Sequence, residues 1–175
     1  THAIYAPQKG EIYIMGGTIT GSDGIGIKSG TLLMDGGTIK ATGANATPTE
    51  GYSNGINASG AAIQIESNSD YEGEVLLDIR GGTIESAKGY SIYEYLSEGT
   101  ETAVDAMNIT GGSFKGAIAV SEELAEANVL AIEGGMFSVN PTPWVYEPWI
   151  AKKGSNRTYP WTVEKSIEAK IGTKA

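Results

Sequence analysis

A chain of 175 residues with 40% hydrophobic residues is long enough for one folded domain and too apolar for a disordered segment. Its 25 glycines show no Gly-X-Y period and accompany only 6 prolines, which excludes collagen and favours short strands joined by tight turns. The 21 acidic and 12 basic residues give a net charge of −9, which argues against nucleic acid and anionic membranes as partners, and the absence of cysteine excludes disulfides and thiolate chemistry.

Charge is unevenly distributed along the chain, and no segment suggests a membrane span. Residues 1–149 hold 19 acids and 6 bases, a net charge of −13, whereas residues 150–175 hold 2 acids and 6 bases, a net charge of +4. No run of 18 apolar residues occurs, so we expect no membrane insertion. The start has neither an initiator Met nor a basic leader, which indicates a mature or excised fragment with a frayed His2.

One motif, two glycines followed after one residue by Ile or Phe, occurs five times along the chain. The copies are Gly16-Gly17-Thr18-Ile19, Gly36-Gly37-Thr38-Ile39, Gly81-Gly82-Thr83-Ile84, Gly111-Gly112-Ser113-Phe114 and Gly134-Gly135-Met136-Phe137. Glycine permits positive φ angles and lets backbones approach closely, so each pair predicts a corner. The copies are unequally spaced, so the extra residues of the longer ones must leave as loops.

Large apolar residues occupy the same positions around every copy, four and two residues before the first glycine and three after it. They are Ile12, Ile14 and Ile19; Leu32, Met34 and Ile39; Leu77, Ile79 and Ile84; Met107, Ile109 and Phe114; Leu130, Ile132 and Phe137. Alternation before the glycines predicts a strand with one buried face, and the change of phase after them predicts a bend.

A second apolar pair follows each of the first four corners and predicts a further strand. These pairs are Ile25 and Ile27, Ile63 and Ile65, Tyr90 and Ile92, and Ile118 and Val120. Each copy therefore supplies about three short strands. One copy cannot bury its apolar side chains alone, whereas stacked copies can, with neighbouring strands about 4.8 Å apart.

The repeat therefore predicts an all-β fold. Its form is a right-handed parallel β-helix (β-solenoid) of about five rungs over residues 1–140, each rung being one copy of the repeat. A β-sandwich is the alternative, because glycine-rich turns also mark sandwiches, but a sandwich has no reason to repeat the same offsets. We expect loops over residues 41–60 and 93–102, and a short helix over residues 121–128, where acids follow an N-cap serine.

Composition changes near the C-terminal end. Four of the six prolines and all three tryptophans lie between Pro141 and Trp161. Because the last rung of a stack exposes strand edges and an open core, residues 141–163 predict a C-terminal cap with a closing strand over residues 159–163. Residues 164–175 predict a tail or linker.

The repeated apolar-x-apolar-x-Gly-Gly-Thr-Ile pattern, joined by Gly-Ile-x-Ile as in residues 24–27, resembles a known group of folds. These are the pectin-lyase-like parallel β-helices of the Gly-Gly-Thr-Ile repeat type, as in adhesin-like bacterial surface proteins and related phage or prophage structural proteins. The resemblance covers residues 10–163, although Met136 stands where the family has Thr. It implies the fold and an extracellular location, on a bacterial cell surface or a phage virion, and specifies function poorly.

The same fold hosts polysaccharide lyases and hydrolases, so a glycan-processing enzyme is the alternative function. Hydrolases use two carboxylates about 5–10 Å apart, and outward positions offer Asp35, Asp78 and Glu133. A lyase needs cationic groups, and Arg80 is one of only two arginines. With 21 acids in the chain a chance alignment is expected, so we predict no catalytic residues.

No metal or cofactor is predicted. His2, the single histidine, is at the start of the chain, where a triad or a metal site is not expected. Turns at residues 22–24 and 68–70 offer oxygen ligands for calcium but match no calcium-binding loop. Hydrogen bonds from these side chains to their own backbone explain the same residues.

Three tyrosines, Tyr90, Tyr93 and Tyr95, are the candidate binding residues. Exposed tyrosines stack on sugars or anchor protein partners, whereas the alternative is that Tyr90 faces the core and the others cover a loop. The sequence therefore predicts a non-catalytic surface-display or structural module. Its candidate partners are a glycan, a host-surface receptor, or neighbouring domains and subunits of a larger surface or virion assembly.

Overall fold

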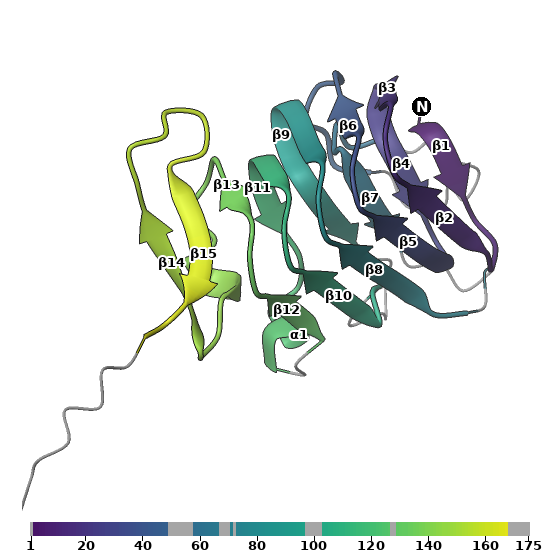
Figure 1. Ribbon diagram of the computed structural model, residues 1–175. Coiled ribbons are helices and arrows are strands. Elements are labelled where there is room, and N and C mark those ends of the chain that lie inside the picture. Colours follow the sequence, from purple (N-terminus) through teal and green to yellow (C-terminus); the bar gives the residue numbers. More distant parts are fainter. Residues whose placement is uncertain are drawn as a thin grey trace, which may run out of the picture.

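The computed structural model describes residues 2–48, 58–66, 71, 73–96, 103–126 and 129–167. These residues form an all-β structure in which parallel strands build two sheets, with one short helix and one 3-10 turn (Figure 1). The predicted all-β class is therefore confirmed. No helix among the described residues is long and apolar enough to cross a membrane.

The smaller sheet holds five strands, in the order β12-β10-β8-β5-β2, and every neighbouring pair is parallel. Its strands are β2 (Glu11–Ile14), β5 (Gly30–Met34), β8 (Val75–Ile79), β10 (Ala106–Ile109) and β12 (Leu130–Ile132). Each is the strand that the sequence predicts immediately before a Gly-Gly pair, so the five copies of the repeat lie side by side.

The larger sheet follows the order β1-β4-β7-β9-β11-β13-β15-β14, and a branch of β3 and β6 joins it at β9. All pairs are parallel except β13–β15 and β14–β15. The strands are β1 (His2–Ala6), β3 (Thr18–Gly21), β4 (Asp23–Ile27), β6 (Thr38–Ala41), β7 (Ile63–Glu66), β9 (Thr83–Tyr95), β11 (Ser113–Ala119), β13 (Met136–Phe137), β14 (Trp149–Lys153) and β15 (Trp161–Lys165).

The strand register stacks the fifteen predicted apolar residues in three columns. The columns are Ile12, Leu32, Leu77, Met107 and Leu130; Ile14, Met34, Ile79, Ile109 and Ile132; and Ile19, Ile39, Ile84, Phe114 and Phe137. Thirteen of these side chains are buried. Ile12 and Ile19 are only partly buried because they belong to the first copy, where one side of the column has no further Gly-Gly repeat to cover it.

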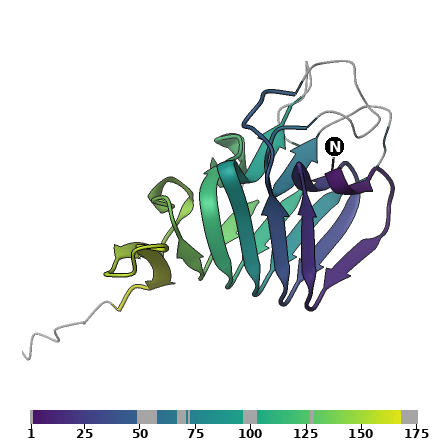
Figure 2. The ribbon, with the colours of Figure 1, turned by 90° about the horizontal axis from the view of Figure 1, so that it is seen from above.

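Each corner places its second glycine in the left-handed region, as the repeat predicts. The φ angles are +79° at Gly17, +82° at Gly37, +86° at Gly82, +95° at Gly112 and +103° at Gly135. The successive bends lie in a row along one edge of the stack (Figure 2). At Gly82 an added Cβ would lie 2.4 Å from Cε of Met34 and 2.8 Å from the carbonyl oxygen of Gly37, so both the backbone angle and the space require glycine there.

The second predicted strand of each copy is also present, with one correction. Ile25 pairs with Ile63, and Ile63 pairs with Ile92, so these residues form a further column. Tyr90, predicted to hold the inward position of Ile25, instead pairs with Ala117 and is only partly buried. The reason is that β9 carries two more residues between its corner and its second element than the first copy does, which moves Ile92 into the column.

The structure describes only part of the three insertions that the sequence predicts between the copies of the repeat. The short helix predicted over residues 121–128 is α1 (Glu123–Glu126). Residues 49–57 of the predicted loop over 41–60, and residues 97–102 of the one over 93–102, lie outside the described residues. Tyr93 and Tyr95 were expected in the latter excursion but belong to β9, because the strand continues to residue 95.

The C-terminal segment continues the larger sheet as an antiparallel hairpin. After the 3-10 turn η1 (Thr142–Trp144), β14 and β15 pair with each other, and β15 pairs with β13. The closing strand predicted over 159–163 is β15, shifted by two residues, and β14 was not predicted. Trp144, Trp149 and Trp161 are partly buried and pack against the core.

Candidate functional site

The predicted tyrosine trio separates into an accessible pair and a buried residue. The rings of Tyr90 and Tyr93 stack with their centroids 4.8 Å apart and their planes 16° from parallel. Both side chains are partly exposed, whereas Tyr95 is only 9% exposed. The pair therefore offers an accessible aromatic surface, and Tyr95 belongs to the interior.

A small hollow lies beside this pair. Asn45, Ala46 and Thr47 line it opposite Tyr90 and Tyr93, and its volume is about 120 Å³. Its lining therefore combines two aromatic rings with the amide of an asparagine and the hydroxyl of a threonine. Tyrosine, asparagine and threonine can all exchange hydrogen bonds with a ligand, and no charged side chain lines the hollow, so the lining suits an uncharged polar ligand such as a sugar.

The hydroxyl of Tyr93 remains a neutral hydrogen-bonding group in this setting. Burial raises the pKa of Tyr93, and the neighbouring Tyr90 and Tyr95 raise it further. Because the phenol already ionises far above neutral pH, the raised pKa keeps it protonated throughout the physiological range.

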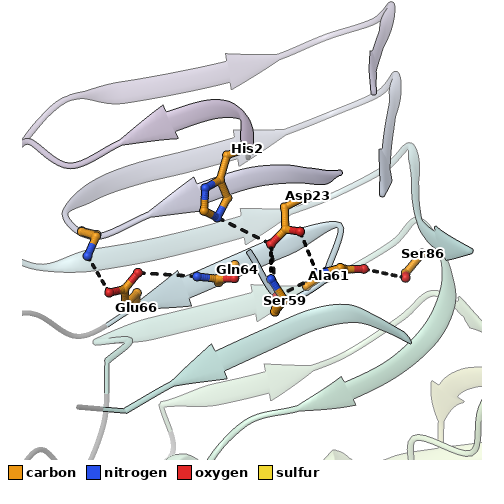
Figure 3. Close-up of polar contacts among 9 residues, drawn as sticks. His2, Asp23, Ser59, Ala61, Gln64, Glu66 and Ser86 are labelled. Atoms are coloured by element: carbon orange, nitrogen blue, oxygen red, sulfur yellow. Dashed lines mark hydrogen bonds and ion pairs between the residues drawn. The ribbon is translucent and has the colours of Figure 1, made fainter. Parts of the chain in front are cut away.

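One wall of the hollow is held by a buried carboxylate. Asp23 is fully buried, and its side chain accepts the backbone N–H groups of Ser59 at 2.8 Å and Gly60 at 2.7 Å (Figure 3). The hydroxyl of Ser59 donates to the same carboxylate at 3.2 Å. The carbonyl oxygen of Ser59 in turn accepts the N–H of Ala46 at 3.0 Å. Asp23 is therefore connected, through Ser59, to the segment that carries Asn45 and Thr47.

The other wall is tied to the same network. The hydroxyl of Ser86 donates to the carbonyl oxygen of Gly60 at 2.7 Å (Figure 3). The same hydroxyl accepts the N–H of Gly89 at 2.9 Å. Gly89 immediately precedes Tyr90, and a Cβ at Gly89 would lie 3.3 Å from Oδ1 of Asn45. The network thus fixes both the tyrosine strand and the facing asparagine, and the bare glycine lets them approach.

His2 is part of this buried region, so the expected frayed start is wrong. It begins β1, its side chain is 1% exposed, and its Nε2 lies 3.6 Å from Oδ2 of Asp23. Pairing of β1 with β4 positions it, because His2 is opposite Asp23 in the register. Histidine, aspartate and Ser59 do not form a catalytic triad here, because the carboxylate lies between the other two and the serine hydroxyl donates to it.

A second buried polar cluster lies farther along the same strands. Nζ of Lys28 is 2.6 Å from Oε1 of Glu66, and their side chains are 1% and 6% exposed. The amide of Gln64 donates to the other oxygen of Glu66 at 3.5 Å, and Nζ of Lys28 lies 5.4 Å from the centre of the Tyr71 ring. The sequence reasoning missed this pair, because β7 and the end of β4 are separated in sequence by a long insertion.

Glu94 has a related structural role. It is 7% exposed and accepts the backbone N–H groups of Ala103, Val104 and Ser121 at 2.7, 3.2 and 2.8 Å. These contacts fasten the chain where it returns from the excursion after β9. Part of the acidic surplus therefore stabilises backbone rather than facing a ligand.

Two of the three outward carboxylates proposed for the enzyme alternative, Asp35 and Asp78, lie near each other on either side of one arginine, whereas Glu133 lies apart. Asp35 and Asp78 both contact Arg80, at 3.7 Å and 2.5 Å, and Tyr13 donates a hydrogen bond to Asp35. The Asp78 hydrogen bond raises the pKa of Arg80, and the Asp35 hydrogen bond raises the pKa of Tyr13. Glu133 follows β12, three strands away from β5, a separation of about 14 Å at the usual strand spacing.

Metal ligation is not indicated within the described part of the chain, where no group of three His, Asp or Glu side chains could hold an ion. The turn at residues 22–24 was a candidate calcium loop. Its Asp23 instead accepts hydrogen bonds from distant backbone N–H groups, which neither the calcium interpretation nor a local turn had suggested. The second candidate turn, residues 68–70, lies outside the described residues.

The chain was compared with protein-family models, with curated proteins and with solved structures. No protein-family model, no curated protein and no solved structure matches the chain.

Proposed function

We propose that this chain is a non-catalytic display module that binds a neutral glycan at the Tyr90–Tyr93 hollow. Its scaffold is a right-handed parallel β-helix of five rungs, and residues 141–163 form its C-terminal cap. The three apolar columns, the repeated positive φ angles and the parallel register support the scaffold. The partly buried tryptophans of the C-terminal segment support the cap.

The single observation that carries the binding proposal is the stacked, accessible pair of tyrosines beside Asn45 and Thr47. Aromatic rings contact the apolar face of a sugar, and neighbouring amide and hydroxyl groups bind its hydroxyls. A shallow hollow of about 120 Å³ fits one sugar ring of a longer chain rather than an enclosed small molecule. The network centred on Asp23 supports a preformed site, which limits the entropy lost on binding.

Charge narrows the class of glycan. Residues 1–149 carry a net charge of −13, so a polyanionic sugar such as a uronate polymer is repelled at long range. No basic residue lines the hollow. Neutral hexoses and N-acetylated sugars are therefore the favoured ligands.

The setting we propose is the outside of a cell or particle. The Gly-Gly-Thr-Ile repeats resemble those of adhesin-like bacterial surface proteins and phage structural proteins, and a repetitive stack of rungs makes a stiff spacer. In such a setting the module holds its glycan site away from neighbouring domains of a larger assembly. An adhesin or a virion component both fit this role.

A glycan array with purified protein tests the proposal. We expect binding to neutral glycans, reduced at least about fivefold by Tyr90→Ala or Tyr93→Ala, because loss of one stacking ring removes about 1–3 kcal/mol, the range for a nucleobase stacked on an aromatic side chain. Tyr146→Ala is the matched control, since this tyrosine is exposed and lies away from the hollow. Absence of any glycan signal, or equal loss in the control, would contradict the proposal.

A further inference from the structure

The N-terminal end of the stack is covered over only one of the three strands of the first copy. β1 pairs with β4, whereas β2 ends the smaller sheet and β3 pairs only with β6 among the described residues (Figure 1). The corner at Gly16 and Gly17 joins β2 to β3. Residues 11–21 therefore form a continuous strand–corner–strand edge, which we call the first edge.

The apolar side chains of the first edge are less buried than their counterparts in the next copy. Ile12 and Ile19 are only partly buried. Leu32 and Ile39, which follow them in the same columns, are 0% exposed because a preceding copy covers them. The first edge therefore lacks the cover that every later copy receives.

Backbone groups of the first edge also point to the uncovered side. The N–H of Asp35 donates to the oxygen of Ile14 at 2.9 Å, so Ile14 faces β5. Alternate residues of a parallel strand face the same neighbour, and the backbone groups of Glu11 and Tyr13 therefore point away from β5. Both residues are exposed, Tyr13 by 54%. A further strand can therefore reach this side of β2.

The corners show what kind of segment belongs there. The first glycine of each later corner is in contact with the corner before it, because an added Cβ would lie 2.3–2.7 Å from the carbonyl oxygen that precedes the earlier Gly-Gly pair. None of these first glycines has a positive φ, so the close approach of two corners requires them. The glycines and the residues that carry the oxygens are Gly36 with Met15, Gly81 with Asp35, Gly111 with Arg80, and Gly134 with Thr110.

Gly16 holds the same position in the first copy, but neither reason for a glycine applies to it. Its φ is not positive, and no atom of the described residues lies within 4 Å of an added Cβ. Gly10, which stands opposite Gly30 just before β2 and β5, is equally bare. Both glycines leave room for the backbone of one more corner and strand.

A second molecule of this chain is a poor source of that segment. Its own corners already contact one another, and its last copy is closed by β15, which pairs with β13, and by η1, which lies against β12. We propose that the first edge docks a strand–Gly-Gly–strand segment of a partner polypeptide, which extends the stack by one turn. This interface is separate from the Tyr90–Tyr93 hollow and does not depend on glycan binding.

Calorimetric titration of the full chain with a synthetic segment tests the proposal. The probe is an acetylated and amidated peptide with the sequence of residues 30–41, because this segment covers the third copy in the proposed register, with β5 on β8 and β6 on β9. The control peptide has alanine in place of both glycines. We expect saturable binding of the probe alone, since alanine disfavours the positive φ of the corner. Equal binding of the two peptides would refute a site for a glycine corner.

Gly16→Ala is the most specific variant of the first edge. It should leave the melting temperature of the free chain nearly unchanged but weaken probe binding at least about tenfold, because its Cβ lies where the incoming carbonyl oxygen belongs. Gly154→Ala is the matched control, since no described atom lies within 4 Å of its added Cβ and it belongs to the C-terminal hairpin. Undiminished probe binding by Gly16→Ala would overturn the proposal.

Two further measurements test the source of the segment. A dimer of the free chain in sedimentation experiments, abolished by Gly16→Ala, would assign the first edge to a second molecule and contradict a partner polypeptide. Joining the probe sequence to the N-terminus of the chain tests the other source. A higher melting temperature of this fusion, without binding of the free probe, would assign the first edge to the same polypeptide and also contradict the proposal.

Discussion

The smaller sheet and the strands β1, β4, β7 and β9 of the larger sheet are built on different principles. In the smaller sheet the same pattern recurs in every strand: large apolar side chains at fixed offsets from Gly-Gly point inward, while the outward positions are mixed, from Asp78 and Asn108 to Leu33 and Leu76. The β1–β4–β7–β9 region instead buries charged and polar side chains, used once each. These residues are His2, Asp23, Lys28, Gln64, Glu66 and Glu94.

This difference indicates that the repeated apolar columns stabilise the stack of strands, whereas the buried polar residues shape a local site. A column of equivalent apolar residues can be extended by adding copies, and no single copy is specialised. The polar region depends on insertions that occur once, and it fixes the walls of the Tyr90–Tyr93 hollow through Asp23, Ser59 and Ser86 (Figure 3). A site of this kind is therefore expected where the repeat is least regular.

The largest expected effect is on the apolar columns. Phe114→Ala should lower the free energy of unfolding by about 3–5 kcal/mol, because Phe114 is fully buried and stacks on Phe137 at 4.8 Å. Ile19→Ala, in the same column but partly exposed at its end, should cost clearly less. Chemical denaturation of both variants measures the difference, and equal costs would contradict a stack that is most tightly packed in its middle.

Asp23→Ala should cost about 3 kcal/mol, because two buried backbone N–H groups lose their acceptor. It should also weaken glycan binding, since the segment bearing Asn45 is held through Ser59. Glu164→Ala is the control; its exposed ion pair with Lys152 contributes at most about 1 kcal/mol. If Asp23→Ala unfolds no more easily than this control, the buried polar region does not stabilise the fold.

Substitution of the corner glycines by alanine should lower the melting temperature to three different extents. Gly82→Ala combines a positive φ with contacts shorter than a real Cβ allows, Gly17→Ala has the positive φ but open space, and Gly16→Ala has neither. Strain at such a backbone angle costs about 1–3 kcal/mol, so the losses should fall in that order. Melting temperatures of the three variants check the ranking, and a reversed order would show that the corners tolerate side chains.

The smallest effect is expected on the outer face of the smaller sheet. Alanine at Asp35, Asp78 and Glu133 together should change the melting temperature no more than Glu11→Ala does, because exposed ion pairs contribute little. Glycan binding should also be unchanged. A large loss of either would give these carboxylates a role beyond surface charge.

The periodic part of the molecule could be predicted from the sequence, because each column is defined by local offsets such as those of Ile39 and Ile84 from their glycines. The partners of Asp23 and Lys28 could not, since the hydrogen bonds and the ion pair join strands on opposite sides of a long insertion. Tyr90 was assigned to the wrong face because β9 adds two residues after its corner. Even so, the tyrosine cluster itself pointed to the region where the hollow lies.

The most direct test of a display module against a glycan-processing enzyme uses one glycan and two readouts. The glycan that binds most strongly on the array is incubated with the protein, and bound glycan and released reducing ends are measured together. We predict saturable binding that requires Tyr90 and Tyr93, with no release of reducing ends. Release that is abolished by Asp35→Asn, Asp78→Asn or Glu133→Gln would contradict the account and make the protein an enzyme.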